Sequence, residues 1–256
     1  MKQRRMKLDM KRFFLLSLVL GLIAATWQND FLNEQKRYER VRTAIAEKES
    51  SMKSLLDDNS IKIKEMNLLI VAYKSEGIME LYAKNKAQST YKKIQSYSIC
   101  ANSGYLGPKR KMGDGQVPEG FYHIDRFNPT SNYYLSLGIN YPNASDRKLS
   151  TASNLGGDIF IHGSCVTIGC MPMTDDKIKE IYLYAVHAKN NGQQKIPVYI
   201  FPFKMTEMNY FLHKKTYSTN KTLLHFWSKL KVGYDAFEAN HQELKFTVDK
   251  AGVYCF

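Results

Sequence analysis

The sequence places a histidine and a cysteine eight residues apart, in an arrangement that could support nucleophilic chemistry. A short apolar run, residues 159–161, leads directly into His162, and Cys170 follows Gly169. A free cysteine has a pKa of about 8.5 and is mostly protonated at neutral pH, whereas its thiolate is the nucleophile. A neighbouring imidazole can take that proton and leave a thiolate–imidazolium pair. The pattern therefore suggests Cys170 as the nucleophile and His162 as its base.

Three further residues of this stretch could support the same chemistry. Gly169 allows the backbone to approach a substrate closely. The N–H groups at Cys170 and just before it could stabilise an oxyanion. Thr167 could orient His162 or cap a turn, and the sequence favours neither role. We assign Gly163 to the same supporting group.

Three other interpretations of the pair compete with catalysis. Cys165 and Cys170 could form a disulfide, which would silence the nucleophile. His162, Cys165 and Cys170 could bind zinc, although a fourth nearby ligand is missing. Both residues could also be ordinary core residues, because a histidine and a cysteine close in sequence are weak evidence on their own.

The N-terminal residues resemble an export signal. Six basic residues and one acid precede an uninterrupted apolar run at residues 13–25. This is the layout of a secretory signal, and the run is shorter than the roughly 20 residues that span a bilayer. We therefore expect a signal peptide or N-terminal membrane anchor over residues 1–26, and a location in the periplasm or cell envelope.

Export to an oxidising compartment makes the four cysteines informative. They could form two disulfides in three connectivities. We expect Cys165 not to pair with Cys170, because a nucleophile must be free. The remaining pair, Cys100 and Cys255, could bridge, but nothing in the sequence compels it.

The pattern of apolar residues predicts a mainly β or α+β fold. Lys74 to Gly77 separates two apolar runs and indicates a hairpin, whereas residues 102–120 contain five glycines and two prolines and indicate a long loop. Thr174 is a typical helix cap. The predicted strands are residues 68–73, 78–82, 95–101, 121–126, 133–139, 159–161 and 196–201, and the predicted helices are residues 30–58, 174–189 and 203–231.

We expect four segments along the chain. After the leader, an amphipathic helix or spacer occupies residues 27–62, a catalytic domain occupies 63–203, and a helical extension packed on it occupies 204–256. The formal charge is +13, and it is still +8 without the basic leader. Such a charge favours an anionic partner, but no zinc-finger spacing or basic helix points to nucleic acid.

Several segments together resemble the YkuD-type L,D-transpeptidase catalytic domain family, in particular its YafK-like branch. The resemblance covers roughly residues 65–256. It rests on IHG at residues 161–163 with TIGC at 167–170, GPKRK at 107–111, GDGQVPEGFY at 113–122, LSLGINYPN at 135–143 and GYDAFE at 233–238.

The resemblance implies a β-rich catalytic domain with helices at both ends and no cofactor or metal. In this family the cysteine attacks the carbonyl of a peptidoglycan stem-peptide bond next to meso-diaminopimelate, and the acyl-enzyme passes to an amine acceptor. Partners would be stem peptides and, in the YafK-like branch, a wall-linked lipoprotein. Lys109, Arg110 and Lys111 could attract stem-peptide carboxylates, although a charged loop is more often simply solvated.

Two positions depart from the family pattern. Most members have histidine where this chain has Ile168, and Arg or Asn where it has Pro172. An arginine there would hold a substrate carboxylate with two hydrogen bonds, which proline cannot do. The acceptor could therefore be water, which would make the protein an amidase that cleaves the diaminopimelate–lipoprotein link. A third hypothesis is a peptidoglycan-binding module without turnover.

Overall fold

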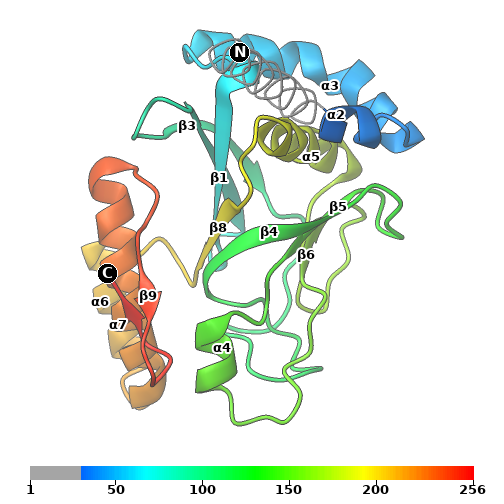
Figure 1. The fold of residues 1–256 in the computed structure, drawn as a ribbon. Helices are drawn as coiled ribbons and strands as arrows, with labels where there is room; N and C mark the ends of the chain where they lie inside the picture. The colour runs from blue at the N-terminus through cyan, green and yellow to red at the C-terminus, as the bar shows by residue number, and fades with distance from the viewer. Residues whose placement is uncertain (1–29) are drawn as a thin grey trace, which may run out of the picture.

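A mixed sheet of eight strands, in the order β3-β2-β1-β8-β4-β5-β6-β7, forms the centre of the molecule (Figure 1). The computed structural model describes residues 30–256, so the predicted leader lies outside the described residues. The strands are β1 (Met66–Tyr73), β2 (Ile78–Asn85), β3 (Lys92–Ser98), β4 (Gly120–Asn128), β5 (Ser136–Ile139), β6 (Phe160–His162), β7 (Met171–Pro172) and β8 (Ile196–Phe201), with a separate pair, β9 (Thr247–Val248) and β10 (Tyr254–Cys255).

The centre of the sheet is buried on both faces. β1 forms the predicted antiparallel hairpin with β2 and pairs in parallel with β8. Successive β1 side chains point to opposite faces, so Leu68 and Ile70 join one hydrophobic core while Leu69 and Val71 join another. This burial on both faces explains why the sequence of β1 is a nearly continuous apolar run, without alternating polar residues.

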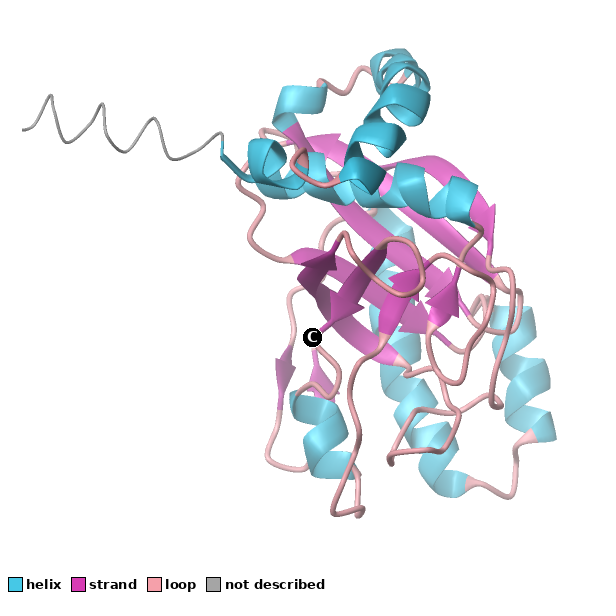
Figure 2. Cartoon of the chain, turned by 90° about the vertical axis from the view of Figure 1, so that its right-hand side faces the viewer, coloured by secondary structure: helices cyan, strands magenta, loops and turns pink. Residues whose placement is uncertain are grey.

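Helices supply the two layers that cover the sheet (Figure 2). The N-terminal helices α2 (Asp30–Gln35) and α3 (Glu39–Asp58) lie with α5 (Asp175–Asn190) over one face, and α7 (Lys221–Asn240) covers the other. α6 (Glu207–Thr216) precedes α7, and the short helices η2 (Ile63–Glu65) and α4 (Ala144–Leu149) lie in connections. The expected β-rich fold with helices at both ends is therefore confirmed.

The single helix predicted over residues 30–58 is wrong, because the chain breaks between α2 and α3. Tyr38 is extended, with φ −88° and ψ 130°. The break lets α2 dock on α5, where the Tyr182 hydroxyl donates to Gln35 Oε1 at 2.7 Å and Leu32 N–H donates to Asn190 Oδ1 at 3.0 Å. These tertiary contacts outweigh the helical periodicity of the segment.

The helix predicted over residues 203–231 is likewise two helices. The chain turns at residues 217–220, and the Asn220 side chain caps α7 by accepting from Leu223 N–H at 3.1 Å. The strand predicted from Tyr133 begins only at Ser136, because Tyr134 has a φ of +69° and lies in the preceding loop. Among the helices of residues 30–256, none is long and apolar enough to cross a membrane.

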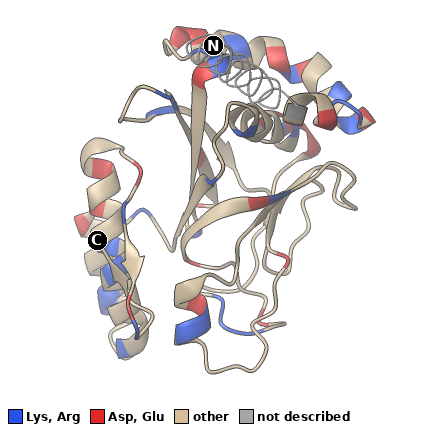
Figure 3. Cartoon of the chain, in the orientation of Figure 1, with Lys and Arg blue, Asp and Glu red and all other residues tan. Residues whose placement is uncertain are grey.

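Charged residues of both signs are spread over the surface of the helices. Figure 3 shows lysine and arginine interspersed with acidic residues on the N-terminal helices and on the C-terminal pair. Both signs of charge therefore occur together on these helices in this view.

Candidate active site

Two adjacent parallel strands bring His162 and Cys170 to the same region of the sheet. β6 pairs with β7 so that His162 lies opposite Pro172. Cys170 immediately precedes β7, in the bend that follows Gly169. The pairing brings the thiol of Cys170 to the N–H of Phe160, two residues before His162 on β6.

The imidazole of His162 is buried and held by its own backbone neighbour. Its Nδ1 lies 2.6 Å from the carbonyl oxygen of Gly163, and the residue is only 2% exposed. A carbonyl oxygen only accepts, so Nδ1 carries the proton of the neutral ring and Nε2 keeps its lone pair. Burial lowers the pKa of His162, while the hydrogen bond to Gly163 acts in the opposite direction.

The thiol of Cys170 is free and partly exposed. Its Sγ lies 3.6 Å from the carbonyl oxygen of Asp158. Burial raises the pKa of Cys170, opposed by the N–H of Phe160, and the Asp158 carboxylate raises it further while Lys109 lowers it. The resting side chain is therefore a thiol that needs a base. Cys170 lines a cavity of about 290 Å³.

Thr167 organises the turn that presents Cys170. Its Oγ1 accepts hydrogen bonds from the N–H groups of Gly169 at 3.1 Å and Cys170 at 2.8 Å, and donates to the Cys170 carbonyl at 2.8 Å. Of the two roles considered for Thr167, these contacts are those of a turn cap. The two amides expected to form an oxyanion hole are occupied by this hydroxyl, so that role stays a prediction and requires the hydroxyl to release them.

Gly169 is required by the backbone of the same turn. Its φ is +138°, which residues other than glycine rarely adopt, and an added Cβ would lie 3.0 Å from the Gln116 carbonyl oxygen. Gly163 holds His162 through its carbonyl, while its N–H contacts the Tyr133 and Leu135 carbonyls at 3.0 and 3.2 Å. Gly163 therefore contacts His162, whereas Thr167 and Gly169 belong to the turn of Cys170.

A disulfide joins Cys100 to Cys165, with their Cα atoms 5.3 Å apart. Cys170 is unpaired, as expected, and Cys255 is also free, so the pairing of Cys100 with Cys255 is not realised. With Cys165 in a disulfide, its sulfur is no longer a thiolate ligand for the zinc site considered above. The bridge ties the segment after β3 to the loop before Cys170, and Cys100 N–H also donates to the Pro172 carbonyl at 3.0 Å.

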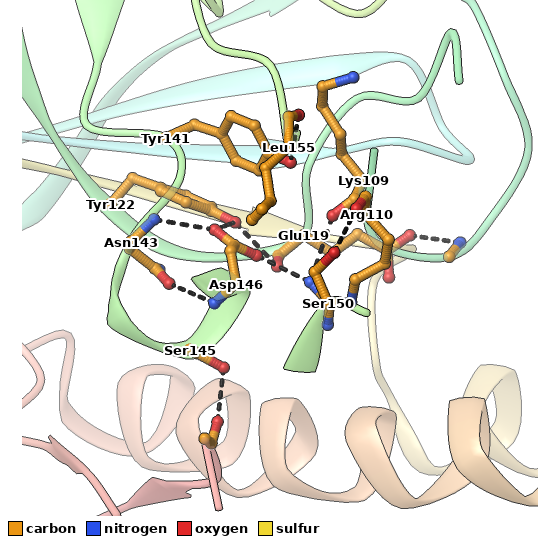
Figure 4. Close-up of polar contacts among 12 residues, drawn as sticks. Lys109, Arg110, Glu119, Tyr122, Tyr141, Asn143, Ser145, Asp146, Ser150 and Leu155 are labelled. Atoms are coloured by element: carbon orange, nitrogen blue, oxygen red, sulfur yellow. Dashed lines mark hydrogen bonds and ion pairs between the residues drawn. The ribbon is translucent and has the colours of Figure 1, made fainter. Parts of the chain in front are cut away.

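The three basic residues proposed to bind substrate differ in their surroundings. Lys109 Nζ lies 2.6 Å from Asp114 Oδ1, and Arg110 Nη1 lies 2.8 Å from the buried Asp146 Oδ1. Figure 4 shows the network in which Asp146 also receives hydrogen bonds from its neighbours. Lys111 is exposed. Lys109 and Arg110 therefore hold the loop together, and their role toward substrate stays untested.

Sequence reasoning missed two features near the site. The Tyr133 ring lies 4.7 Å from the His162 ring, and a buried ion pair joins Lys74 to Glu119 at 2.9 Å. A lysine in a predicted hairpin turn normally points to solvent, so nothing in the sequence indicated burial. Glu119 stands within the GDGQVPEGFY segment, which carried the resemblance but indicated no partner.

The sequence also matches known proteins. Two curated relatives, named "Putative L,D-transpeptidase YafK" from Escherichia coli K12 and O157:H7, are each 43% identical over 171 residues, which is 66% of this chain and 65% of theirs. The chain thus spans slightly less than two thirds of their length.

Two solved structures are similar at low scores. The helical cell shape determining protein Pgp2 from Campylobacter jejuni aligns with a TM-score of 0.43 and 18% identity, covering 77% of this chain and 80% of that one. L,D-transpeptidase 1 from Mycobacterium tuberculosis aligns at 0.27 with 12% identity, covering 53% and 62%. Scores this low add nothing to the assignment.

The family is identified by the sequence of the central sheet. Residues 67–200, from β1 to the end of β8, match the family model described as the L,D-transpeptidase catalytic domain, YkuD. This range is more than half of the chain and contains His162, Cys170 and the turn between them. The chain therefore belongs to the YkuD family of L,D-transpeptidase catalytic domains.

Proposed function

We propose that this protein is a cell-wall enzyme in which the Cys170 thiolate attacks a stem-peptide carbonyl next to diaminopimelate. The observation that carries the proposal is the state of His162. Its Nδ1 is fixed to the Gly163 carbonyl, which leaves Nε2 free to accept a proton, and its strand β6 pairs with β7, which begins directly after the free Cys170. The family assignment gives the reaction class, which is acyl transfer between peptides.

The reaction would proceed in two balanced steps. In the first, His162 takes the thiol proton, Sγ bonds to the carbonyl carbon, and the amide C–N bond breaks as the imidazolium returns the proton to the leaving amine. In the second, an acceptor amine attacks the thioester, the C–S bond breaks, and the proton passes through His162 back to the thiolate. A raised thiol pKa and a lowered imidazole pKa keep the resting pair neutral.

Water is the alternative acceptor and would make the enzyme an amidase acting on a diaminopimelate–lipoprotein link. The observation that favours it is Ile168, which is 88% exposed beside the nucleophile. A histidine at this position could orient an amine, whereas an isoleucine offers an amine no hydrogen bond. Water at about 55 M competes whenever the amine is poorly held.

A peptidoglycan-binding module without turnover is the rival from another class. Selective reaction of Cys170 with a thiol-directed probe would argue for an enzyme, because only a cysteine with a base nearby is activated. Cys255 is the other free cysteine and is exposed, so Cys255→Ser provides a background in which Cys170 is the sole free thiol.

The decisive experiment uses purified protein and defined muropeptides, with and without an amine acceptor. We expect acyl-enzyme formation and conversion by the wild type and by Cys255→Ser, and none by Cys170→Ala with an intact fold. Unchanged processing by Cys170→Ala would disprove the proposed nucleophile.

We also propose the cellular setting and the division of the chain. The enzyme would be exported through its leader and act on peptidoglycan in the periplasm, touching the membrane only through that N-terminal segment. Residues 27–62 would form the spacer, 63–203 the catalytic domain, and 204–256 an extension packed on it. The packing of α7 on the sheet through Trp227 and Leu230 supports the last part.

A further inference from the structure

The cavity beside Cys170 is completed by a residue from beyond the matched family region, residues 67–200. Tyr217, in the turn between α6 and α7, lines it together with Cys170. The long loop contributes Tyr105, Leu106 and Val117 to the same lining. The C-terminal extension therefore contributes directly to the space that faces the nucleophile.

This cavity presents no free charge. Lys74 is the one charged residue in its lining. The Lys74 ammonium lies 3.2, 2.8 and 2.9 Å from the carbonyl oxygens of Tyr105, Gly107 and Val117, and 2.9 Å from Glu119 Oε1. An ammonium has three N–H donors, so these acceptors use its whole capacity. The rest of the lining is uncharged, with polar Ser75, Asn102 and Ser103 among aromatic, aliphatic and sulfur-containing side chains.

The ion pair between Lys74 and Glu119 connects the cavity rim to α7. Glu119 is fully buried, and its Oε1 also accepts from Gly107 N–H at 2.7 Å. Its Oε2 accepts from Trp227 Nε1 at 2.8 Å. The Trp227 ring in turn packs edge-on against Tyr217, with centroids 5.0 Å apart. One buried tryptophan thus supports both walls of the cavity.

We propose that Tyr217 is a specificity-determining residue that contacts an uncharged, partly apolar segment of the acyl donor, and that Trp227 is a positioning residue acting through Tyr217 and Glu119. This proposal rests on the proposed function, because it takes the cavity beside Cys170 to be the donor site. Burying a charged donor group against Tyr217 without a partner would be costly, whereas peptide backbone and small neutral side chains fit the lining.

The substrate test compares Tyr217→Ala and Tyr217→Phe with Phe211→Ala, which alters an exposed ring on α6 outside the cavity. We expect Tyr217→Ala to raise KM for a defined muropeptide by about tenfold, as for the loss of an aromatic contact. In the inactive Cys170→Ala background, Tyr217→Ala should raise the Kd for the same muropeptide by a similar factor. Tyr217→Phe and Phe211→Ala should stay close to wild type. An unchanged Kd in Tyr217→Ala would overturn the role of Tyr217.

The positioning role needs a readout that a purely structural change would not give. Trp227→Phe keeps most of the ring but removes the N–H that reaches Glu119. We expect KM to rise while kcat and the rate of Cys170 alkylation by iodoacetamide change less than about twofold, with the fold verified by circular dichroism. A fall in kcat at constant KM would contradict the assignment.

The preference for a neutral segment can be tested without turnover, in the Cys255→Ser background. N-acetyl-alanyl-alanine amide should protect Cys170 from iodoacetamide better than N-acetyl-glutamyl-alanine amide, and Tyr217→Ala should remove the difference. Equal protection by both peptides would reject the neutral cavity. Absence of muropeptide turnover together with selective protection would instead count against the proposed function alone.

Discussion

The ring of Tyr133 lies over the His162 imidazole, with centroids 4.7 Å apart and an angle of 32° between the planes. The loop that carries Tyr133 is held from a distant part of the chain. Arg40, at the start of α3, donates from Nη1 to the carbonyl oxygens of Ser131 at 2.5 Å and Tyr134 at 2.6 Å. Arg40 of α3 therefore holds the two residues that flank Tyr133 on either side of the loop, Ser131 and Tyr134.

This relationship predicts that Tyr133 positions His162. Tyr133→Ala should lower kcat by about tenfold, because an imidazole without its stacking partner samples unproductive orientations. Tyr133→Phe should keep most of the activity, since it keeps the ring. Arg40→Ala should act in the same direction but less strongly. Arg42→Ala is the matched control, because Arg42 binds only the carbonyls of Lys36 and Arg37, before α3. Equal kcat for Tyr133→Ala and Tyr133→Phe would contradict the role of the ring.

The lowered pKa of His162 makes a prediction for the pH–rate profile. A general base must be unprotonated, so kcat/KM should rise with pH through the His162 pKa and then level off. Because burial depresses that pKa, the midpoint of the rise should lie at a lower pH than the ordinary histidine pKa of about 6.5. His162→Ala should lose several orders of magnitude in rate and also lose this limb. A variant that keeps both would show that His162 is structural.

Much of the fold could be predicted because the signals are local. Lys74 to Gly77 between two apolar runs indicated the β1–β2 hairpin, which the register confirms. Thr174 was expected to cap the helix at residues 174–189, and its Oγ1 accepts from Lys177 N–H at 3.3 Å at the start of α5. In both cases the residues that determine the structure are within a few positions of one another.

The features that the sequence did not reveal depend on distant partners. Cys100 and Cys165 are 65 residues apart, and Cys100 is brought to this loop by its contact with Pro172 of β7. The break at Tyr38 depends on where α5 presents Asn190. The burial of Lys74 depends on a loop more than 30 residues away. No pattern within a short window carries such information.

The disulfide predicts a dependence on redox conditions. Cys100→Ser, or reduction, should lower the free energy of unfolding by about 2–4 kcal/mol, because the bridge restricts the unfolded chain. It should also raise KM, because the segment after Cys100 lines the cavity beside Cys170. Thermal unfolding and muropeptide kinetics, each with and without reductant, measure the two effects. Cys255→Ser is the control and should change neither, and a disulfide-free variant with unchanged Tm and KM would refute the prediction.

The hydrogen bonds of Thr167 in this turn predict that Thr167→Val lowers both stability and Cys170 reactivity, although valine has nearly the same shape as threonine. The valine leaves the N–H groups of Gly169 and Cys170 without their acceptor, which costs about 1–3 kcal/mol where they are buried. We expect lower stability and slower alkylation of Cys170, measured by denaturation and iodoacetamide kinetics. Thr167→Ser keeps the hydroxyl and should preserve both. If Thr167→Val instead forms the acyl-enzyme faster from a defined muropeptide, the freed amides act as oxyanion donors and the hydroxyl is inhibitory.

Ile168 allows a test of which acceptor, an amine or water, takes the acyl group from Cys170. Acylation requires the thiolate and its base, whereas aminolysis also requires an amine held against the thioester and water kept out. Ile168 is exposed beside Cys170, where most family members have histidine. We expect the wild type to release free carboxylate even with a large excess of amine. Ile168→His should shift the products toward transpeptidation by several fold, because the imidazole can hydrogen-bond the incoming amine, and Ile168→Ala should not. Product analysis by mass spectrometry gives the ratio. Exclusive transpeptidation by the wild type would show that Ile168 does not determine the acceptor.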